Sequence, residues 1–353
     1  MVIQGLSCAI GIFLQPLDNN FIISWFVAAF VLVSQIFTHM VMMWESLTKQ
    51  QQHNAFLRHL NDIEVAFKLR LRMDIGKVKI MKKLTKALII LSIISVGGLI
   101  IFGVGVIISN DPGYFWWAIF AILAMRLRLL QGQFYVELLA HYVMSLNQKL
   151  NQVVRLKTKG DQPFLDTDNR NLRTLEYLNH IKELYSNIYE AFYCFNEIAQ
   201  TSLFASTVSY FLDCTCHIYW SLLVMDKLLP TTSILFALAT IIPLCTNLYK
   251  FCYVCQQVKE ESRRTSVLVS RLAVADSPYT GLDLQQNYKA LVYDFSLQLI
   301  HQHFVVTGKR FFNFDLQCIF GICVLILTHL IILIQFSKNY DISNTKNQSQ
   351  TVN

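Results

Sequence analysis

The feature that most constrains this chain is its last apolar run, from Asp315 to Phe336, which reads DLQCIFGICVLILTHLIILIQF. As a helix rising about 1.5 Å per residue it would span roughly 33 Å, enough to cross the hydrocarbon core of a bilayer. The run therefore predicts a transmembrane helix. The whole chain of 353 residues is 54% hydrophobic and only 15% charged, which is too apolar for a soluble protein of this size. We expect an all-α membrane protein that folds as a polytopic helical bundle.

The apolar runs predict six clear spans and a shortened first span. The clear spans are expected at residues 21–44, 87–109, 114–140, 198–225, 231–255 and 315–336. The run at about 2–15 is short for a span, and it lacks the basic region and cleavage site of a signal segment, which favours a shortened first helix. Three long polar segments lie between the spans at 45–86, 141–197 and 256–314, and a tail follows at 337–353. From Leu172 to Phe192 apolar residues recur at helical spacing, which predicts an amphipathic helix continuing into the next span.

The basic residues predict the orientation. The three long polar segments hold 24 of the 30 Lys and Arg, and they lie on one side of the membrane because two spans separate each from the next. By the positive-inside rule this side is cytosolic and the tail is extracellular. These segments explain the net charge of +7 better than a nucleic-acid surface does, and the basic run at 45–86 could also bind anionic membrane lipids. In the tail, Asn347 begins an Asn-Gln-Ser glycosylation pattern.

Polar residues inside the last span point to one face of its helix. Thr328, Ile331 or Ile332, and Gln335 recur at helical spacing, so they lie along one stripe. A glutamine this deep is costly if it faces lipid, so we expect the stripe to face protein or water. Two interpretations remain open. In the first, Thr328 and Gln335 form hydrogen bonds to neighbouring helices. In the second, the stripe lines an aqueous path that the isoleucines constrict.

Arg126 and Arg128 interrupt the expected span at 114–140. Charges at that depth are costly, so both side chains should face the bundle interior, water or lipid headgroups. There are three alternatives: the side chains pair with other residues, they act in gating or an ion path, or they snorkel to the interface.

The sequence carries no pattern typical of an enzyme, a metal site or a bound cofactor. No span holds a nucleophile with a spaced base and acid, and no glycine-rich phosphate loop occurs. The cysteines lie in or beside apolar runs, so we expect no disulfide framework. Cys252 and Cys255 form a Cys-x-x-Cys without a second pair. His301 and His303 are two residues apart and diverge on a helix.

The end of the last span resembles a known family. Thr328 to Phe336, THLIILIQF, is similar to the C-terminal signature of insect gustatory receptors, which reads Thr-Tyr, five apolar residues, Gln-Phe. The stretches at 295–301 and 311–315 resemble the family's helix and aromatic elbow before the last span. The chain departs from the family at His329, where Tyr is usual, and at Lys309-Arg310, where small residues are more usual.

The resemblance implies a fold, an activity and partners. The fold would be a seven-span receptor with a cytosolic N-terminus and an extracellular C-terminus, in the plasma membrane of sensory neurons. The activity would be that of a ligand-gated non-selective cation channel, in which the polar segments extend the membrane helices into an anchor where subunits meet. Four subunits, identical or mixed with sister subunits, would surround a central pore. The pore residues would be Thr328, Ile331, Ile332, Gln335 and Phe336.

A small-molecule tastant would bind from outside, among the middle helices. Candidate ligand-binding residues are Trp25, Trp116, Trp117, Asp213, His217, Tyr219, Trp220, Thr232 and Phe236. Such an aromatic pocket suits a hydrophobic ligand better than a sugar, and the alternative is that the rings form interface belts and helix packing. Asp213 and His217, at i and i+4, would form a polar floor or pair with each other. The stretches at 45–48 and 60–64 also resemble receptors of this family, including groups associated with bitter detection, which favours aversive compounds.

A seven-helix receptor that signals through a G protein is the alternative function. The inverted orientation argues against it, as does the lack of an Asp-Arg-Tyr at a cytosolic span end and of an Asn-Pro-x-x-Tyr in the last span. A secondary transporter has less support, because Asp213 is the one acid well inside a span and no duplicated halves are evident.

Overall fold

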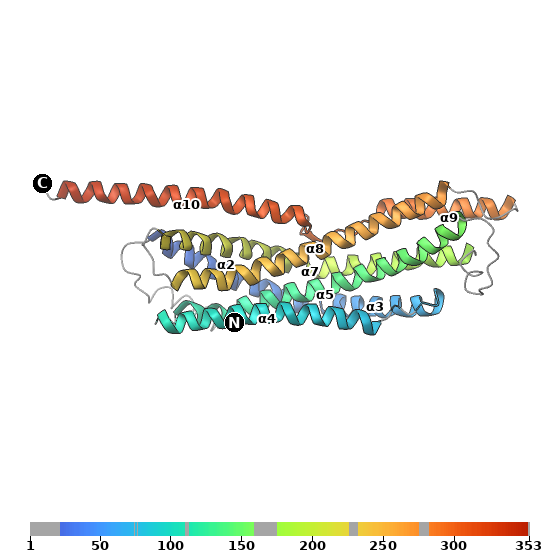
Figure 1. The fold of residues 1–353 in the computed structure, drawn as a ribbon, viewed down its shortest axis with the longest axis horizontal. Helices are drawn as coiled ribbons and strands as arrows, with labels where there is room; N and C mark the ends of the chain where they lie inside the picture. The colour runs from blue at the N-terminus through green and yellow to red at the C-terminus, as the bar shows by residue number, and fades with distance from the viewer. Residues whose placement is uncertain are drawn as a thin grey trace.

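Nearly all the residues that the structure describes are helical (Figure 1). The computed structural model describes residues 22–73, 75, 77–109, 113–158, 175–225, 232–274 and 282–351. The helices are α2 (Ile22–Thr48), α3 (Gln50–Arg70), α4 (Lys77–Ser109), α5 (Gly113–Thr158), α7 (Leu175–Met225), α8 (Thr232–Val274), α9 (Leu282–His301) and α10 (Leu316–Thr351). An antiparallel hairpin of β1 (Thr307–Gly308) and β2 (Phe312–Asn313) joins α9 to α10. The all-α prediction is confirmed apart from this hairpin, and the run at 2–15 lies outside the described residues.

The helices form one elongated bundle with two halves (Figure 1). In one half, here called the membrane half, α2, α4 and α10 lie along the apolar parts of α5, α7 and α8. In the other, the anchor half, α3 and α9 lie along the polar parts of the same three helices. Because α5, α7 and α8 pass residues 140, 197 and 255 without a break, the polar segments directly continue the apolar helices. The amphipathic helix expected before residue 198 does run on within α7.

Four of the described helices have stretches long and apolar enough to cross a membrane. They are Ala29–Thr48 in α2, Leu84–Val104 in α4, Ala237–Val274 in α8 and Leu316–Phe336 in α10. The spans expected at 114–140 and 198–225 fall in α5 and α7, whose described residues contain no stretch of that kind. These two helices carry buried polar residues such as Arg126 and Asp213, which face other helices rather than lipid. The total of seven spans and their orientation stay predictions.

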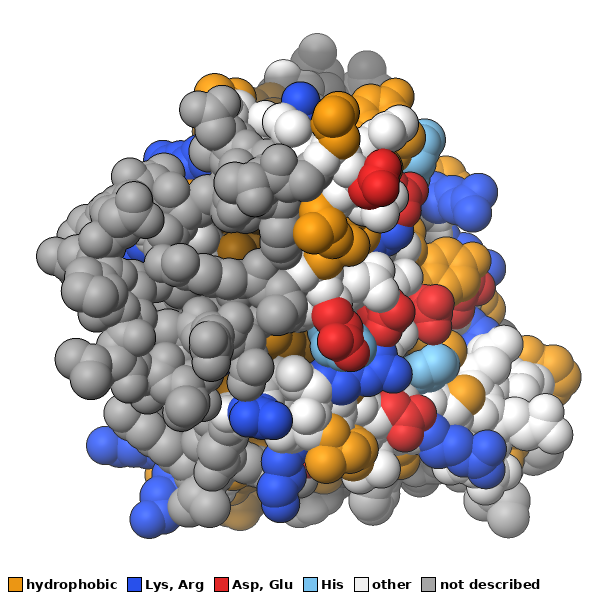
Figure 2. Space-filling model, turned by 90° about the vertical axis from the view of Figure 1, so that its right-hand side faces the viewer, with side chains coloured by type: hydrophobic (Ala, Val, Ile, Leu, Met, Phe, Trp, Pro, Cys, Tyr) orange, Lys and Arg blue, Asp and Glu red, His pale blue; other side chains and the backbone are white. Residues whose placement is uncertain are grey.

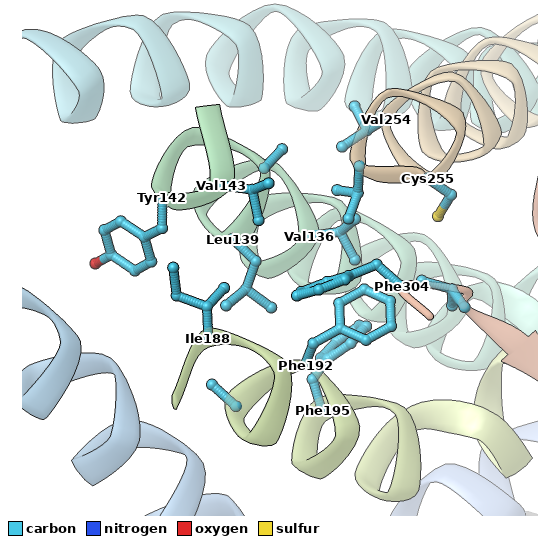
Figure 3. Close-up of a cluster of buried hydrophobic side chains, with 14 of the residues drawn as sticks. Val136, Leu139, Tyr142, Val143, Ile188, Phe192, Phe195, Val254, Cys255 and Phe304 are labelled. Atoms are coloured by element: carbon cyan, nitrogen blue, oxygen red, sulfur yellow. The ribbon is translucent and has the colours of Figure 1, made fainter. Parts of the chain in front are cut away.

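Large aromatic side chains fill the core of the anchor half (Figure 3). Phe304, which follows α9, has its ring centroid 5.3 Å from that of Tyr185, 5.6 Å from Tyr189 and 5.0 Å from Phe192. Aliphatic side chains of α5 close the other side of this core, among them Val136, Leu139 and Val143. Most apolar positions expected on α7 are buried as the spacing predicts: Leu178, Ile181, Tyr185, Ile188 and Phe192. Leu175 is half-buried against the core, and Leu172 lies outside the described residues.

The described part of the far end of the anchor half carries charged side chains of both signs beside hydrophobic ones (Figure 2). Figure 2 shows Lys and Arg side chains interspersed there with Asp and Glu. Arg70 of α3 and Glu183 of α7 form an ion pair, as do Lys182 of α7 and Asp294 of α9. Such exposed pairs contribute about 1 kcal/mol or less, so the apolar core carries most of the packing energy here.

Candidate functional site

The elbow, residues Thr307 to Asp315, turns the chain into α10. Asp315 caps the helix, because its Oδ1 accepts a hydrogen bond from the backbone N–H of Cys318 at 3.1 Å. Its Oδ2 accepts another from Lys259 Nζ of α8 at 3.1 Å. A carboxylate in this place satisfies a free backbone N–H and interacts favourably with the helix dipole. The first turn of α10 is therefore fixed against α8.

The elbow is also held on α7. Asn196 Oδ1 accepts a hydrogen bond from the Thr307 N–H at 3.0 Å, and Asn196 Nδ2 donates to Thr307 Oγ1 at 3.3 Å. The ring of Phe311 stacks on Phe204 with centroids 5.2 Å apart. The aromatic elbow expected at 311–315 is present and bridges α7 to α8.

Beyond the elbow, α10 contacts the rest of the chain along one face. Among the side chains of residues 316–336, Leu330 is the one that is buried, and it packs on Tyr219 and Leu223 of α7. His329 lies beside this contact, with its ring 5.2 Å from that of Phe211 and its Nδ1 2.8 Å from the Leu325 carbonyl oxygen. The helix thus leans on α7 and leaves most of its surface free.

The opposite face of α10 carries the polar residues of the span. Gln317, Thr328 and Gln335 are all exposed, and their spacing places them opposite Leu330, with Ile331 near them. We call Gln317, Thr328, Ile331 and Gln335 the polar stripe. The Thr328 hydroxyl donates to the Val324 carbonyl within its own helix at 2.9 Å. Gln335 has no hydrogen-bond partner in the part of the chain that the structure describes, so neither residue joins neighbouring described helices.

The other expected pore residues are exposed too. The exposed fractions are 57% for Ile331, 42% for Ile332 and 64% for Phe336. Phe336 follows Gln335 directly, so about 100° of helix rotation separates the two side chains.

A buried polar layer crosses the membrane half. Asp213 of α7 is 1% exposed and accepts a hydrogen bond from Gln35 Nε2 of α2 at 2.8 Å. Arg126 of α5 is 2% exposed and donates through Nη1 to the Ser95 carbonyl of α4 at 2.6 Å. Ser95 Oγ in turn accepts from Asn247 Nδ2 of α8 at 3.0 Å. Arg126 is therefore paired inside the bundle, which is the first of the alternatives raised from the sequence.

The polar layer is only partly satisfied. Gln35 Oε1, Arg126 Nε, Asn247 Oδ1 and the Tyr210 hydroxyl are buried without a hydrogen-bond partner among the described residues. An unpaired buried polar group costs about 1–3 kcal/mol. Ordered water or the polar group of a ligand would relieve that cost, so this layer is the best described candidate for the polar end of a binding site.

Arg128 belongs to a second cluster, near the junction of the two halves. Its guanidinium lies 3.4 Å from Glu45 Oε2 and donates to Ser202 Oγ at 3.0 Å and to the Ile198 carbonyl at 3.3 Å. Glu45 also accepts from Lys49 Nζ at 2.9 Å and from the Ser202 N–H at 3.1 Å. Arg128 is thus paired as well, and this cluster ties α2 and α5 to the backbone of α7.

The structure brings some of the expected ligand-binding residues together. Asp213, His217 and Trp220 share a face of α7, and the His217 ring lies 5.3 Å from Trp220 in an edge-on contact. No hydrogen bond joins Asp213 to His217, since Asp213 bonds to Gln35 and His217 Nδ1 lacks a partner among the described residues. Tyr219 lies elsewhere, against Leu330 of α10.

The remaining expected site residues lie where side chains are outside the described part. They are Trp25 on α2, Trp116 and Trp117 on α5, Thr232 and Phe236 on α8, and Asn347 on the final turns of α10.

Sequence reasoning missed several members of the polar clusters, namely Gln35, Glu45, Ser95 and Asn247. The available signal was a single polar side chain within or beside an apolar run, since such residues rarely face lipid. Which partner each would find depends on helix packing, and the spacing along one helix does not reveal it.

Two further features concern chemistry and assembly. No group of three His, Cys, Asp or Glu that could hold a metal occurs among the described residues. A groove of about 580 Å³ runs between α8 and α9 in the anchor half, lined by residues that include Arg263, Ser266, Ser296 and His303.

An elongated bundle with membrane-length apolar helices in one half and polar extensions in the other defines a multi-pass membrane protein. Its sequence matches the 7tm Chemosensory receptor family over residues 7–340. It is 24% identical over 340 residues to gustatory receptor 39b of Drosophila melanogaster, covering 96% of this chain and 89% of that protein. The chain belongs to this family of chemosensory receptors, which confirms the resemblance noted from THLIILIQF.

Solved structures show the same fold. The insect olfactory receptor OR5 from Machilis hrabei superimposes with a TM-score of 0.69 at 13% identity, covering 95% of this chain and 87% of that one. The same receptor in complex with eugenol gives a TM-score of 0.65 at 14% identity, with the same coverage.

Proposed function

We propose that this chain is a gustatory receptor subunit that acts as a ligand-gated non-selective cation channel. The observation that carries the proposal is the polar stripe of α10, which faces away from its own subunit. A glutamine facing lipid costs several kcal/mol, so Gln335 requires protein or water that its own chain does not supply among its described residues. A path shared between subunits would supply both.

One chain provides one such helix, so the pore requires an oligomer. We infer a tetramer, homomeric or mixed with sister subunits, whose α10 helices surround the path. The groove between α8 and α9 supports this assembly, because it offers a concave surface in the anchor half for a neighbouring subunit. In this arrangement the C-terminal tail is extracellular, and the receptor lies in the plasma membrane of a sensory neuron.

Gating would follow from the arrangement of side chains around α10. In the closed state Phe336 and the isoleucines Ile331 and Ile332 narrow the path, and their apolar surface excludes water. Rotation of α10 by about 100° exchanges Phe336 for Gln335, which shares a face with Thr328. The exposure of α10 supports this account: among the side chains of residues 316–336 Leu330 is the one that is buried, and Ile319, Ile322, Ile326 and Leu333 pack on the core while only partly buried.

The ligand would bind in the membrane half, on the extracellular side of the buried polar layer. The eugenol complex of the structural neighbour supports a small molecule of this kind. In this chain Asp213 and His217 would contact the polar end of the tastant, and aromatic residues such as Trp220 would contact its apolar part. We favour hydrophobic, aversive compounds over sugars, because a sugar needs many converging hydrogen bonds.

Expression of the chain alone and with sister subunits, with current recorded against a tastant panel, tests the proposal. Gln335→Ala should change conductance or ion preference. The matched control is Leu327→Ala, which alters an exposed residue outside the polar stripe. Unchanged permeation in Gln335→Ala would remove this residue from the pore. Absence of current with every tastant, although the chain and its sister subunits reach the cell surface, would contradict the channel function, and a current that no tastant changes would contradict ligand gating.

A further inference from the structure

The tip of the elbow holds two basic residues in an unfavourable backbone conformation. A β-turn runs from Gly308 to Phe311, closed by a hydrogen bond from the Phe311 N–H to the Gly308 carbonyl at 3.0 Å. Its central residues, Lys309 and Arg310, have φ angles of 49° and 64°. Left-handed backbone costs a side-chain-bearing residue about 1–2 kcal/mol, and turns with two such residues normally use Asn and Gly. This chain accepts the cost at both positions.

Contacts of the neighbouring elbow residues hold the turn in place, but no ion pair with a described residue offsets the cost at Lys309 or Arg310. Lys309 and Arg310 are both exposed, and neither forms an ion pair with a described residue. The nearby carboxylate of Asp315 already bonds to Lys259. Strained backbone positions that the surrounding structure holds in place cluster at functional sites, so the two charges, unpaired among the described residues, point to a partner outside the chain.

Contacts of the elbow place its tip at the membrane boundary. Thr307 bonds to Asn196, and from Ile198 to Leu212 α7 has no charged residue. Phe311 then stacks on Phe204, inside that uncharged stretch. The basic tip therefore lies where α7 passes from its polar part into its apolar part.

Exposed apolar residues follow the tip along the chain. The exposed fractions are 77% for Phe311, 73% for Phe320 and 39% for Leu316. Basic side chains next to exposed aromatic rings are typical of the membrane interface, where rings contact the upper acyl chains and charges reach the phosphates. A soluble acidic segment would match the charges but would leave Phe311 and Phe320 in water.

We propose that Lys309, Arg310 and Phe311 form a docking site for the headgroup of an anionic phospholipid in the cytosolic leaflet. Arg310 can donate two hydrogen bonds to one phosphate, and Lys309 adds a second positive charge. The leaflet carries a negative surface potential that attracts basic groups close to it. Docking would hold the start of α10 at a fixed depth, because Asp315 connects the elbow directly to the first turn of that helix.

The test measures lipid retained by the purified full-length chain. The chain is held in detergent micelles with equimolar phosphatidylserine and phosphatidylcholine, and native mass spectrometry counts the bound lipids and the subunits. The chain should retain phosphatidylserine in excess. In the double variant Lys309→Asn/Arg310→Gly, the preference for phosphatidylserine over phosphatidylcholine should fall by up to about 30-fold, given the attraction typical of two basic residues near an anionic surface. Raising the salt concentration should weaken the preference of the original chain as well.

The choice of substitution separates lipid binding from folding. Asn-Gly suits the turn, so the variant should melt at the same temperature as the original chain or higher. Should it melt lower, the inference from backbone cost is wrong, and Lys309→Gln/Arg310→Gln then tests lipid binding on its own. The matched control is Arg271→Gln/Lys289→Gln, which removes two exposed charges from the anchor half and should keep the preference.

Three results would overturn the proposal. The first is a phosphatidylserine preference that survives loss of both charges at the tip. The second is an equal loss in the control variant, which would indicate a general effect of charge. The third is an unchanged preference with fewer subunits per particle, which would assign the tip to contact with a neighbouring subunit.

Discussion

Gly98 of α4 lies where that helix approaches α8 very closely, and replacing it with Ala should weaken their packing. A Cβ atom at Gly98 would lie 2.5 Å from the Ala239 carbonyl oxygen and 2.6 Å from Cγ of Pro243. Neither atom belongs to a flexible side chain, so the two helices would have to separate by roughly 1 Å, at a cost of about 1–3 kcal/mol. A Cβ atom at the adjacent Gly97 would meet no described atom of another helix within 4 Å, so this glycine provides a matched control.

The two substitutions share every effect except this contact. Each gains up to about 1 kcal/mol of helix propensity, so Gly97→Ala should be neutral or stabilising and Gly98→Ala should be less stable than it by about 1–3 kcal/mol. Thermal unfolding in detergent can be followed with a thiol-reactive dye, because Cys252 and Cys255 are free and buried. Equal melting temperatures for the two variants would refute the close approach of α4 and α8.

Three further predictions concern charged groups. Glu45→Gln should lower the free energy of unfolding by about 3 kcal/mol, because it leaves the partly buried Arg128 without its carboxylate; a melting temperature equal to the original would contradict the pairing. Asp315→Ala should cost about 1–2 kcal/mol through the lost helix cap and the half-exposed pair with Lys259, and Asp315→Asn should recover the part due to the cap. Burial, and then the charge of Arg128, lower the pKa of His53 in the folded chain below its ordinary 6.5. As the pH falls, the unfolded chain therefore binds a proton at His53 before the folded chain does, and the free energy of unfolding decreases below about pH 6.5. His53→Gln should flatten this fall in melting temperature between pH 7 and pH 5, and an unchanged slope would exclude His53 as its source.

The sequence predicted the features that depend on a single helix. The membrane-length run at 315–336, the amphipathic spacing up to Phe192 and the stripe of Thr328 and Gln335 follow from local periodicity, and the structure has all three, the amphipathic spacing from Leu175 onward. The resemblance carried by THLIILIQF gave the family, which the match over residues 7–340 confirms.

The features that sequence reasoning missed depend on contacts between helices. The burial of Arg126 and Arg128 was among the expected outcomes, but their partners, Ser95 and Glu45, lie on other helices. The alternative in which Asp213 and His217 pair with each other relied on spacing along α7, whereas Gln35 of α2 reaches Asp213 instead. Which partner each polar residue finds depends on how the helices pack, and the spacing along a single helix does not reveal this packing.

The central claim is that the polar stripe of α10 faces an ion path shared between subunits. Gln335→Cys, expressed with the partners needed for current, tests it with a charged thiol reagent applied from outside while a tastant holds the channel open. The unmodified chain, which already carries the exposed Cys245 and Cys323, and Leu327→Cys are the controls. The account predicts irreversible block of the Gln335→Cys current and little change in either control. Undiminished current in Gln335→Cys, or equal block in Leu327→Cys, would contradict it.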